Sequence, residues 1–344
     1  MQNIEYTMMR RALQLAACGE LTCAPNPMVG AVVAGPDGRI LGEGYHHRAG
    51  EPHAEVVALN AVSRSDARLL PQSTLYVSLE PCAHFGRTPP CAALIVRRRV
   101  GRCVVGCRDP FSRVDGQGLE MMRQGGVEVV MAPADIQQEC LWLNRRFVCR
   151  HRLGRPFITL KWAQTADGYI GRRDSRLIVS TPLSRLHAHR LRATHQAILI
   201  GHGTLRSDRP ALTLRHWAGH TPRPYVLGRA GEDELPQGFQ AFAHIDDLLH
   251  TMQREGLQSL LVEGGAQVLQ SFIERDLWDE VWAEISPLPL PEGAQGVEAP
   301  AMPQEFQPQH ITSFQSHYLH WQSPLLKSLY GLTPHDAPPE PPSL

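Results

Sequence analysis

Hydrophobic and polar positions along the first half of the chain form segments that predict alternating helices and strands. Residues 4–18 have the spacing of an amphipathic helix, with Met8, Leu13 and Leu15 at candidate core positions. Beyond them, short apolar runs typical of buried strands alternate with runs of helical spacing. The predicted strands are 28–33, 74–79, 102–107 and 127–131, and the predicted helices are 53–62, 91–98 and 119–124. This alternation predicts an α/β sheet packed between helices.

A second alternation begins after Arg155-Pro156. Its predicted strands are 157–162, 197–201, 224–227 and 259–262, and its predicted helices are 183–193 and 265–274. The Arg-rich segment 145–155 is the predicted linker. We therefore predict one domain over residues 1–150 and another over 151–332. Residues 333–344 contain five prolines, and this composition predicts a disordered tail.

Composition and charge exclude several classes of protein. The 344 residues are enough for two domains, and the 34 basic residues balance the 34 acidic ones. Zero net charge gives no support for a nucleic-acid or membrane-surface protein, because such proteins need a basic excess. Glu5 and Arg10-Arg11 interrupt any export signal, so we expect a cytoplasmic enzyme in a reducing compartment. In such a compartment we interpret the eight cysteines as thiols or metal ligands in preference to disulfides.

Four residues of the first half form a candidate metal site. His53-Ala54-Glu55 is followed by Pro81-Cys82 and later by Cys91, which is the pattern of zinc-dependent deaminases. One imidazole and two thiolates would hold one Zn²⁺ per chain and leave its fourth position to water. The Glu55 carboxylate is predicted to carry the proton of that water to the leaving amine. Both His53 and Cys91 fall at predicted helix starts, where the helix dipole favours a thiolate.

The two cysteines are separated by eight residues, whereas the general pattern has two. The stretch from Glu80 to Cys91 closely resembles the deaminase half of the bifunctional deaminase/reductase of riboflavin biosynthesis. Further resembling segments are 25–30, 44–46, 50–56, 109–110, 143–144 and Phe147. The resemblance implies a cytidine-deaminase-like three-layer α/β/α domain in which Asn26 contacts the pyrimidine substrate. His46 and His47, by contrast, are expected to face solvent.

The second half carries a glycine turn between a predicted strand and a predicted helix. Val262-Glu263-Gly264-Gly265 would let the backbone approach a phosphate at a helix N-terminus, although a plain tight turn would look the same. Lys161 to Gly168 resembles the opening motif of the reductase half of the same family. Segments that match in order are 191–193, 201–204, 208–210 and 212–215. The resemblance implies a dihydrofolate-reductase-like α/β domain that uses NADPH.

The family's residue roles transfer position by position. Residues implied to face NADPH are Ala163, Leu177, Thr204, Asp208, Gly265, Ala266, Gln267, Val268, Leu269, Gln270 and Ser271. Residues implied to face the ribose phosphate substrate are Ser175, Arg192, Leu212, Arg215 and Glu263. Guanidinium groups suit a phosphate because they bind it through two parallel hydrogen bonds. The chain departs from the family at Leu177, where a Trp is common, and at Gly228, where an Asp is expected.

The resemblance implies two successive reactions. The first domain would hydrolyse the 2-amino group of 2,5-diamino-6-(5-phosphoribosylamino)pyrimidin-4-one, and the second would reduce the ribosyl side chain to ribityl with NADPH. Family habit also implies a homo-oligomer. Three alternatives remain: a nucleoside or tRNA-type zinc deaminase, the same deaminase with a weakened reductase half, and a metal-stabilised binding protein without catalysis. The eight-residue loop and the balanced charge argue against the first, and the presence of only three protein ligands argues against the last.

Overall fold

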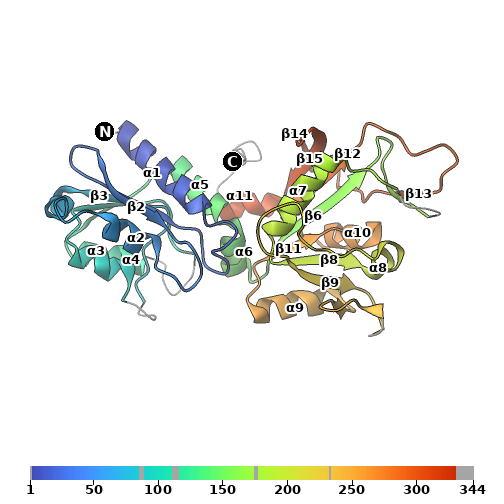
Figure 1. Cartoon of the computed structure of the whole chain (residues 1–344), viewed down its shortest axis with the longest axis horizontal. Coiled ribbons are helices and arrows are strands. Elements are labelled where there is room, and N and C mark those ends of the chain that lie inside the picture. Colours follow the sequence, from blue (N-terminus) through green and yellow to red (C-terminus); the bar gives the residue numbers. More distant parts are fainter. Residues whose placement is uncertain (1, 85–88, 111–115, 174–176, 232–233, 331–344) are drawn as a thin grey trace. The chain divides into compact units, whose positions relative to one another are not determined.

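A computed structural model describes residues 2–84, 89–110, 116–173, 177–231 and 234–330 (Figure 1). The chain divides into two compact units. Residues up to Leu153, joined by Leu329 and Tyr330, belong to the first unit, and Gly154–Ser328 form the second. Ser175 and the predicted tail at 333–344 lie outside the described residues.

The first unit is built on a five-stranded sheet with the strand order β2-β1-β3-β4-β5. Strand β1 pairs antiparallel with β2 and β3, whereas β3, β4 and β5 run parallel. The strands are β1 (Gly30–Ala34), β2 (Ile40–Tyr45), β3 (Thr74–Val77), β4 (Arg102–Val105) and β5 (Glu128–Met131). The helices are α1 (Gln2–Ala17), α2 (Ala54–Ala61), the short 3₁₀ helix η1 (Ala67–Gln72), α3 (Cys91–Arg97), α4 (Gln117–Gln124), α5 (Ala134–Leu143) and α6 (Arg145–Leu153).

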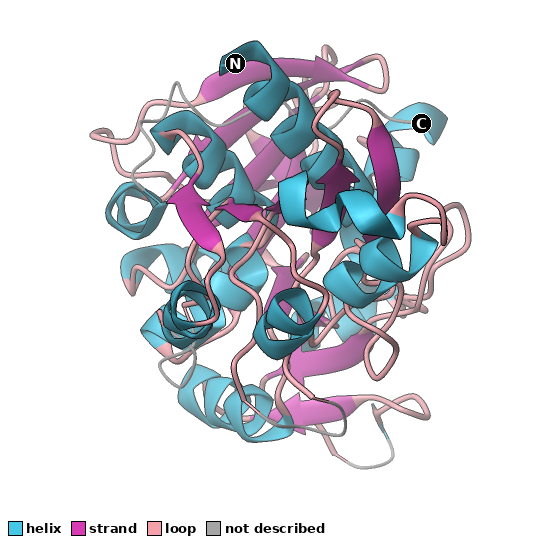
Figure 2. Cartoon of the chain, turned by 90° about the vertical axis from the view of Figure 1, so that its left-hand side faces the viewer, coloured by secondary structure: helices cyan, strands magenta, loops and turns pink. Residues whose placement is uncertain are grey.

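Helices cover both faces of this sheet. Figure 2 shows the helices and strands of the chain in separate colours. Along β1, Ala31 and Val33 enter the core formed with α2, α3 and α4. Val32 and Ala34 enter the opposite core, formed with α1 and α5. Successive side chains of a strand point to opposite faces, so a strand that is apolar at every position is buried on both sides. The predicted three-layer α/β/α architecture of this unit is confirmed.

The second unit contains an eight-stranded sheet with the order β10-β9-β8-β11-β6-β12-β15-β14. The six strands from β10 to β12 run parallel to one another. Strand β15 pairs antiparallel with β12, and β14 pairs antiparallel with β15. The strands are β6 (Phe157–Gln164), β8 (Ala197–Gly201), β9 (Arg223–Leu227), β10 (Gln240–Phe242), β11 (Ser259–Val262), β12 (Glu280–Ile285), β14 (Gln309–Ser313) and β15 (Ser316–Gln322). A separate two-stranded sheet pairs β7 (Tyr169–Arg172) with β13 (Gly296–Glu298).

Helices pack on both faces of the large sheet as well. Side chains of α9 (Ile245–Glu255) and α10 (Ala266–Glu274) fill one core. Side chains of α7 (Pro182–Ala193) and α8 (His202–Asp208) contribute to the other, and α11 (Pro324–Tyr330) ends the described chain. The carboxyl ends of the parallel strands share one edge, which is where open α/β sheets bind their ligands. Gly264 and Gly265 follow β11 at this edge.

The structure differs from the sequence prediction in several elements. The segment predicted as a linker, 145–155, mostly forms α6, because Phe147, Val148 and Cys149 are buried between its arginines. Strands β12 and β15 were not predicted, since Glu284 and His320 break their apolar pattern although both are buried. In the described part of the chain, no helix is both long and apolar enough to cross a membrane.

Candidate functional site

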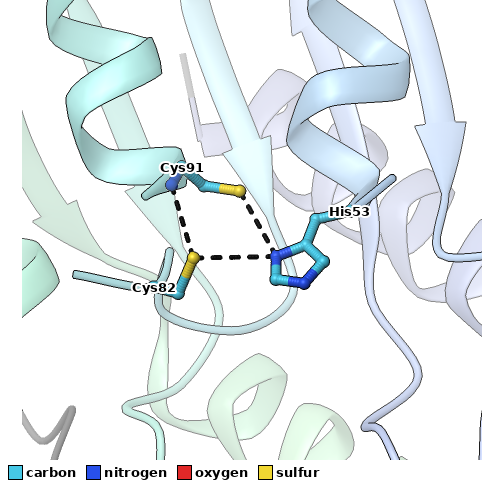
Figure 3. Close-up of side chains that lie close together, drawn as sticks. All are labelled: His53, Cys82 and Cys91. Atoms are coloured by element: carbon cyan, nitrogen blue, oxygen red, sulfur yellow. Dashed lines mark hydrogen bonds between the residues drawn. The ribbon is translucent and has the colours of Figure 1, made fainter. Parts of the chain in front are cut away.

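Three side chains from separate elements of the first unit meet at one point. His53 is the N-cap of α2, Cys91 is the first residue of α3, and Cys82 follows β3 (Figure 3). Nδ1 of His53 lies 3.6 Å from Sγ of Cys82 and 3.4 Å from Sγ of Cys91. Among the described residues this is the one group of three or more His, Cys, Asp or Glu side chains with metal-ligand spacing.

The spacing and chemistry of these atoms fit a zinc ion. A tetrahedral Zn²⁺ holds a nitrogen at about 2.0 Å and a sulfur at about 2.3 Å, which sets those two atoms about 3.5 Å apart. The two measured nitrogen–sulfur distances lie on either side of that value. A set of three protein ligands is typical of a catalytic zinc site, because a structural site has four.

Glu55 lies in the first turn of α2, two residues after His53, and its side chain is buried. Burial raises the pKa of the Glu55 carboxyl to about 7, and the neighbouring His53 lowers it in part. A carboxyl with a pKa near the working pH can both accept and donate a proton. The position and the environment of Glu55 therefore suit a general acid–base residue.

Cys82 is prepared to act as a thiolate. The backbone N–H of Cys91 donates a hydrogen bond to Sγ of Cys82 over 3.3 Å. Contact with the Cys91 side chain, together with the hydrogen bonds from His53 and this N–H, lowers the pKa of Cys82. A thiolate is the form of cysteine that binds a metal. The start of α3 thus stabilises the charge that a zinc ligand needs.

His46 lies at the candidate metal site, contrary to the prediction from the sequence. It was expected to face solvent, but its side chain is 3% exposed and its ring lies edge-on to the ring of His53, with 5.4 Å between the centroids. Its Nε2 lies 3.0 Å from the side-chain amide nitrogen of Asn26, and its Nδ1 lies 3.1 Å from the carbonyl oxygen of Pro52. The Gly44-Tyr45-His46 motif could have indicated that His46 lies at the site, because it is one of the segments that resemble the family.

Predicted cofactor residues of the second unit come together at the end of β11. Gly265, the N-cap of α10, has a φ of +71°, a conformation that glycine adopts without strain. A Cβ at this position would lie 3.3 Å from Oγ1 of Thr204 in α8. The first N–H groups of α10 follow, and the N-terminal N–H groups of a helix have no partner within it. A glycine turn at the N-terminus of a helix is a setting that suits a phosphate group, such as those of NADPH.

The rest of the predicted cofactor stretch is engaged in packing. The Leu269 side chain is fully buried in the core. Gln270 accepts a hydrogen bond from the N–H of Ala301, and Ser271 donates one to the carbonyl of Val268. Ala266, Gln267 and Val268 come before these residues in α10 and directly follow the glycine turn. The remaining cofactor candidates are in separate places: Ala163 on β6, Leu177 after β7 and half-buried, and Asp208 exposed at the end of α8.

Two predicted substrate residues form an ion pair. Nε and Nη2 of Arg192 donate to the two carboxylate oxygens of Glu263 over 2.9 and 2.6 Å. Both side chains are largely buried, and Arg192 lowers the pKa of Glu263 against the effect of burial. Leu212 is buried with a φ of +51°, whereas Arg215 is exposed. Two of the N–H donors of Arg192 are therefore occupied by Glu263, and the more exposed Arg215 is the more available guanidinium.

Gly228, one of the two departures from the family, has a structural counterpart. Its φ is +128°, and a Cβ there would lie 2.9 Å from Cβ of His202. His202 in turn lies 2.9 Å from the carboxylate of Glu234. The glycine is required by its own backbone conformation and by the close approach of α8.

Two family models match separate parts of the chain. The model for the zinc-binding region of cytidine and deoxycytidylate deaminases matches residues 2–107. The model for the RibD C-terminal domain matches residues 156–319. The two matches fall on the first and the second unit of the structure, respectively.

Individual relatives and solved structures resemble the chain over most of its length. The riboflavin biosynthesis protein RibD of Aquifex aeolicus (strain VF5) is 34% identical over 85% of this chain and 89% of that protein. RibD of Escherichia coli (strain K12) is 34% identical over 86% and 91%. A structure of Acinetobacter baumannii RibD matches with a TM-score of 0.83 and 28% identity, covering 93% of this chain and 99% of that one. A diaminohydroxyphosphoribosylaminopyrimidine deaminase/5-amino-6-(5-phosphoribosylamino)uracil reductase from Thermotoga maritima matches with a TM-score of 0.80 and 30% identity, with the same coverage.

Proposed function

The chain belongs to the RibD family of bifunctional deaminase/reductases of riboflavin biosynthesis, and from this premise we propose which of its residues perform the two reactions. It is a zinc-dependent deaminase and an NADPH-dependent reductase in one chain. We assign the deamination to residues 1–150 and the reduction to residues 151–332.

In the deaminase, His53, Cys82 and Cys91 would hold the zinc ion. When bound, the zinc supplies a Lewis acid that makes a water molecule nucleophilic near neutral pH. Glu55 would accept a proton from that water and then donate it to the leaving amine, a role that its buried position in the first turn of α2 supports. Asn26, fixed by His46, would direct its amide towards the edge of the pyrimidine ring.

The proposed substrate of this unit is 2,5-diamino-6-(5-phosphoribosylamino)pyrimidin-4-one, which loses its 2-amino group as ammonia. The product is the substrate of the reductase, so both reactions use a phosphorylated pyrimidine. The name of the Thermotoga maritima protein describes the same two steps.

In the reductase, Thr204 and the Gly265–Val268 turn would receive the phosphates of NADPH. Ala163, Leu177 and Asp208 complete the proposed cofactor contacts, with Leu269, Gln270 and Ser271 supporting the turn. Arg192, Leu212, Arg215 and Glu263 would receive the substrate, together with Ser175, which lies outside the described residues. Hydride transfer then depends on holding the nicotinamide C4 near the acceptor carbon.

The observation that carries this proposal is the meeting of His53, Cys82 and Cys91 beside the buried Glu55. A coupled assay on the purified protein tests it, with the diaminopyrimidine phosphate as substrate. Ammonia release and NADPH absorbance are followed in parallel. Both signals together support the proposal, and ammonia without NADPH consumption would indicate the same deaminase with a weakened reductase half. Zinc-loaded, folded protein that releases no ammonia would overturn the substrate and favour a nucleoside or tRNA-type deaminase.

We further propose a cytoplasmic homo-oligomer that binds neither nucleic acid nor a membrane. The balanced charge supports the absence of a nucleic-acid partner, because phosphate contacts need a basic surface. Sedimentation of the purified protein tests the oligomeric state, and a monomer at micromolar concentration would contradict it.

A further inference from the structure

Two residues of helix α7 form hydrogen bonds with the backbone of the segment that carries Arg215. His189 and Arg192 are three positions apart, and residues at this spacing share one face of a helix. The backbone N–H of Arg215 donates a hydrogen bond to Nδ1 of His189 over 3.2 Å. Nη1 of Arg192 donates to the carbonyl of Thr213 over 3.5 Å. The helix therefore contacts the segment at both Thr213 and Arg215.

The same segment is anchored at its start by Leu212. This side chain is 2% exposed and lies in the core, and its backbone has a positive φ that non-glycine residues seldom adopt. Contacts at Leu212, Thr213 and Arg215 thus fix the path of the backbone at three points of this segment. The backbone of Arg215 is positioned by contacts of its neighbours and of α7, while its side chain remains exposed.

His189 accepts this hydrogen bond as a neutral ring. It is 5% exposed, and burial together with the nearby Arg192, His216 and Arg215 lowers its pKa to about 4, with Glu263 opposing the shift. A neutral imidazole has one acceptor nitrogen and one N–H donor. Because Nδ1 accepts from Arg215, the proton lies on Nε2. The ring of His216 packs edge-on against His189, with 4.8 Å between the centroids.

The two arginines beside His189 differ in what they have left to offer a ligand. Arg192 is committed to Glu263 by two hydrogen bonds, and it also reaches Thr213. The guanidinium of Arg215 has no ion pair within the described residues, and it extends from a fixed backbone. An unpaired guanidinium that extends from a fixed backbone is suited to binding a phosphate through two parallel hydrogen bonds.

We propose that His189 is a positioning residue of the reductase, which holds the backbone of Arg215 so that its guanidinium binds the phosphate group of the substrate. This inference rests on the proposed function, since it takes Arg215 as a substrate residue. It adds a residue to the site and assigns the phosphate end of the substrate to one guanidinium.

Replacement of His189 tests the proposal through ligand binding. The probe is 5-amino-6-(5-phosphoribosylamino)uracil, titrated calorimetrically into the zinc-loaded full chain without NADPH. His189→Leu removes the acceptor, and we expect the Kd to rise about tenfold, as for a lost hydrogen bond that supports a charged contact. His189→Asn offers an oxygen close to the place of Nδ1 and should stay within about threefold of the wild type. Equal weakening by both variants, or an unchanged Kd for His189→Leu, would overturn the proposal.

Three controls separate positioning from a general loss of structure. The Kd for NADPH and the rate of ammonia release should be the same in both variants as in the wild type. The dephosphorylated form of the probe should bind His189→Leu as well as it binds the wild type, because the phosphate contact is absent from both. A matching loss with the dephosphorylated probe would assign His189 a merely structural role and contradict the inference.

A double-mutant cycle with Arg215→Ala distinguishes this inference from the proposed function on which it rests. If His189 acts through Arg215, adding His189→Leu to Arg215→Ala changes the Kd little further. Additive losses would mean that His189 acts by another route. An unchanged Kd for Arg215→Ala alone would instead remove Arg215 from the substrate site, whatever His189 does.

Discussion

The side-chain amide of Asn26 donates a hydrogen bond to Nε2 of the buried His46, 3.0 Å away. The Nδ1–H of His46 donates to the carbonyl oxygen of Pro52, which fixes the tautomer of the ring and leaves Nε2 as the acceptor. Pro52 directly precedes the metal-ligand candidate His53. The residue proposed to contact the pyrimidine is thus oriented by a side chain that packs against the proposed zinc site.

This relationship predicts a defect in substrate binding when His46 loses its acceptor. His46→Leu should raise the KM for the diaminopyrimidine about tenfold while zinc content stays at one per chain, because the Asn26 amide is no longer held. His46→Gln places an acceptor oxygen near Nε2 and should be milder. His47→Leu, at the exposed neighbouring position, is the matched control. If His46→Leu and His47→Leu behave alike, the orienting role of His46 is wrong.

Glu55→Gln should abolish deamination and leave the reductase intact. The amide has nearly the size of the carboxyl but cannot carry a proton, so ammonia release should fall at least about a hundredfold. NADPH oxidation on the deaminated substrate should continue at the wild-type rate. Bound zinc, measured by atomic absorption, should be unchanged. A variant that keeps its ammonia release would remove Glu55 from proton transfer.

Loss of the zinc ligands should act on one activity only. Cys82→Ser, or dialysis against a chelator, should reduce bound zinc and deamination together while reduction persists. Because zinc binds the folded state, its loss should also lower the melting temperature of the deaminase unit. Cys18→Ser is the control, since Cys18 is an exposed thiol outside the cluster. Full zinc content in Cys82→Ser would contradict the ligand assignment.

The burial of His187 is expected to make the stability of the reductase unit depend on pH. Its ring is 1% exposed between Trp282 and Tyr318, and neither ring nitrogen has a hydrogen-bond partner within the described part of the chain. Burial lowers its pKa to about 3, from 6.5. Between these values the unfolded chain binds a proton that the folded chain does not, so this contribution to stability is complete above pH 6.5 and declines as the pH falls.

His187→Phe should remove part of that decline. Phenylalanine fills a similar volume and does not titrate. The free energy of unfolding of the variant, minus that of the wild type, should therefore be larger at pH 5 than at pH 7. Urea midpoints at the two pH values, followed by tryptophan fluorescence, measure the difference. His189 retains its own lowered pKa, so some dependence should remain. Parallel pH profiles for variant and wild type would rule out His187 as a source.

Gly228 should not tolerate a side chain. Gly228→Ala would combine a left-handed φ of +128° with a Cβ only 2.9 Å from that of His202, and should destabilise the reductase unit by about 1–3 kcal/mol. Gly203→Ala is the matched control. Gly203 lies in helix α8, and a Cβ there would have no atom within 4 Å. Urea unfolding compares the two. Equal stabilities would show that the backbone at Gly228 can adapt.

The positions of two candidate zinc ligands could be predicted from the sequence because their signals are local. His53 and Cys91 were placed at helix starts from short windows, and the structure confirms both positions. The fold class, the two activities and the two cofactors are also confirmed, on the strength of motifs such as Glu80 to Cys91 and the comparisons. The residue roles in the two sites remain predictions.

Other features could not be predicted from such windows. Histidine is a polar residue that is expected at the surface, but His46 is buried by contacts with Cys23, Asn26 and Pro52, which are distant or non-adjacent in sequence. Arg192 and Glu263 were both assigned to the substrate, but they pair with each other across 71 positions of sequence. Strand β12 was missed because Glu280 and Glu284 are buried, which a pattern of apolar residues does not reveal.

The sequence by itself determined the helix starts at the candidate zinc ligands, the glycine turn after β11 and the family. These depend on residue types at fixed spacings within one or two elements. Only the tertiary structure decided which polar groups are buried, which guanidinium is already paired and which glycine faces a neighbouring helix. Burial and pairing arise from elements that are distant in sequence, and their energies depend on the water and the partners that folding removes or supplies.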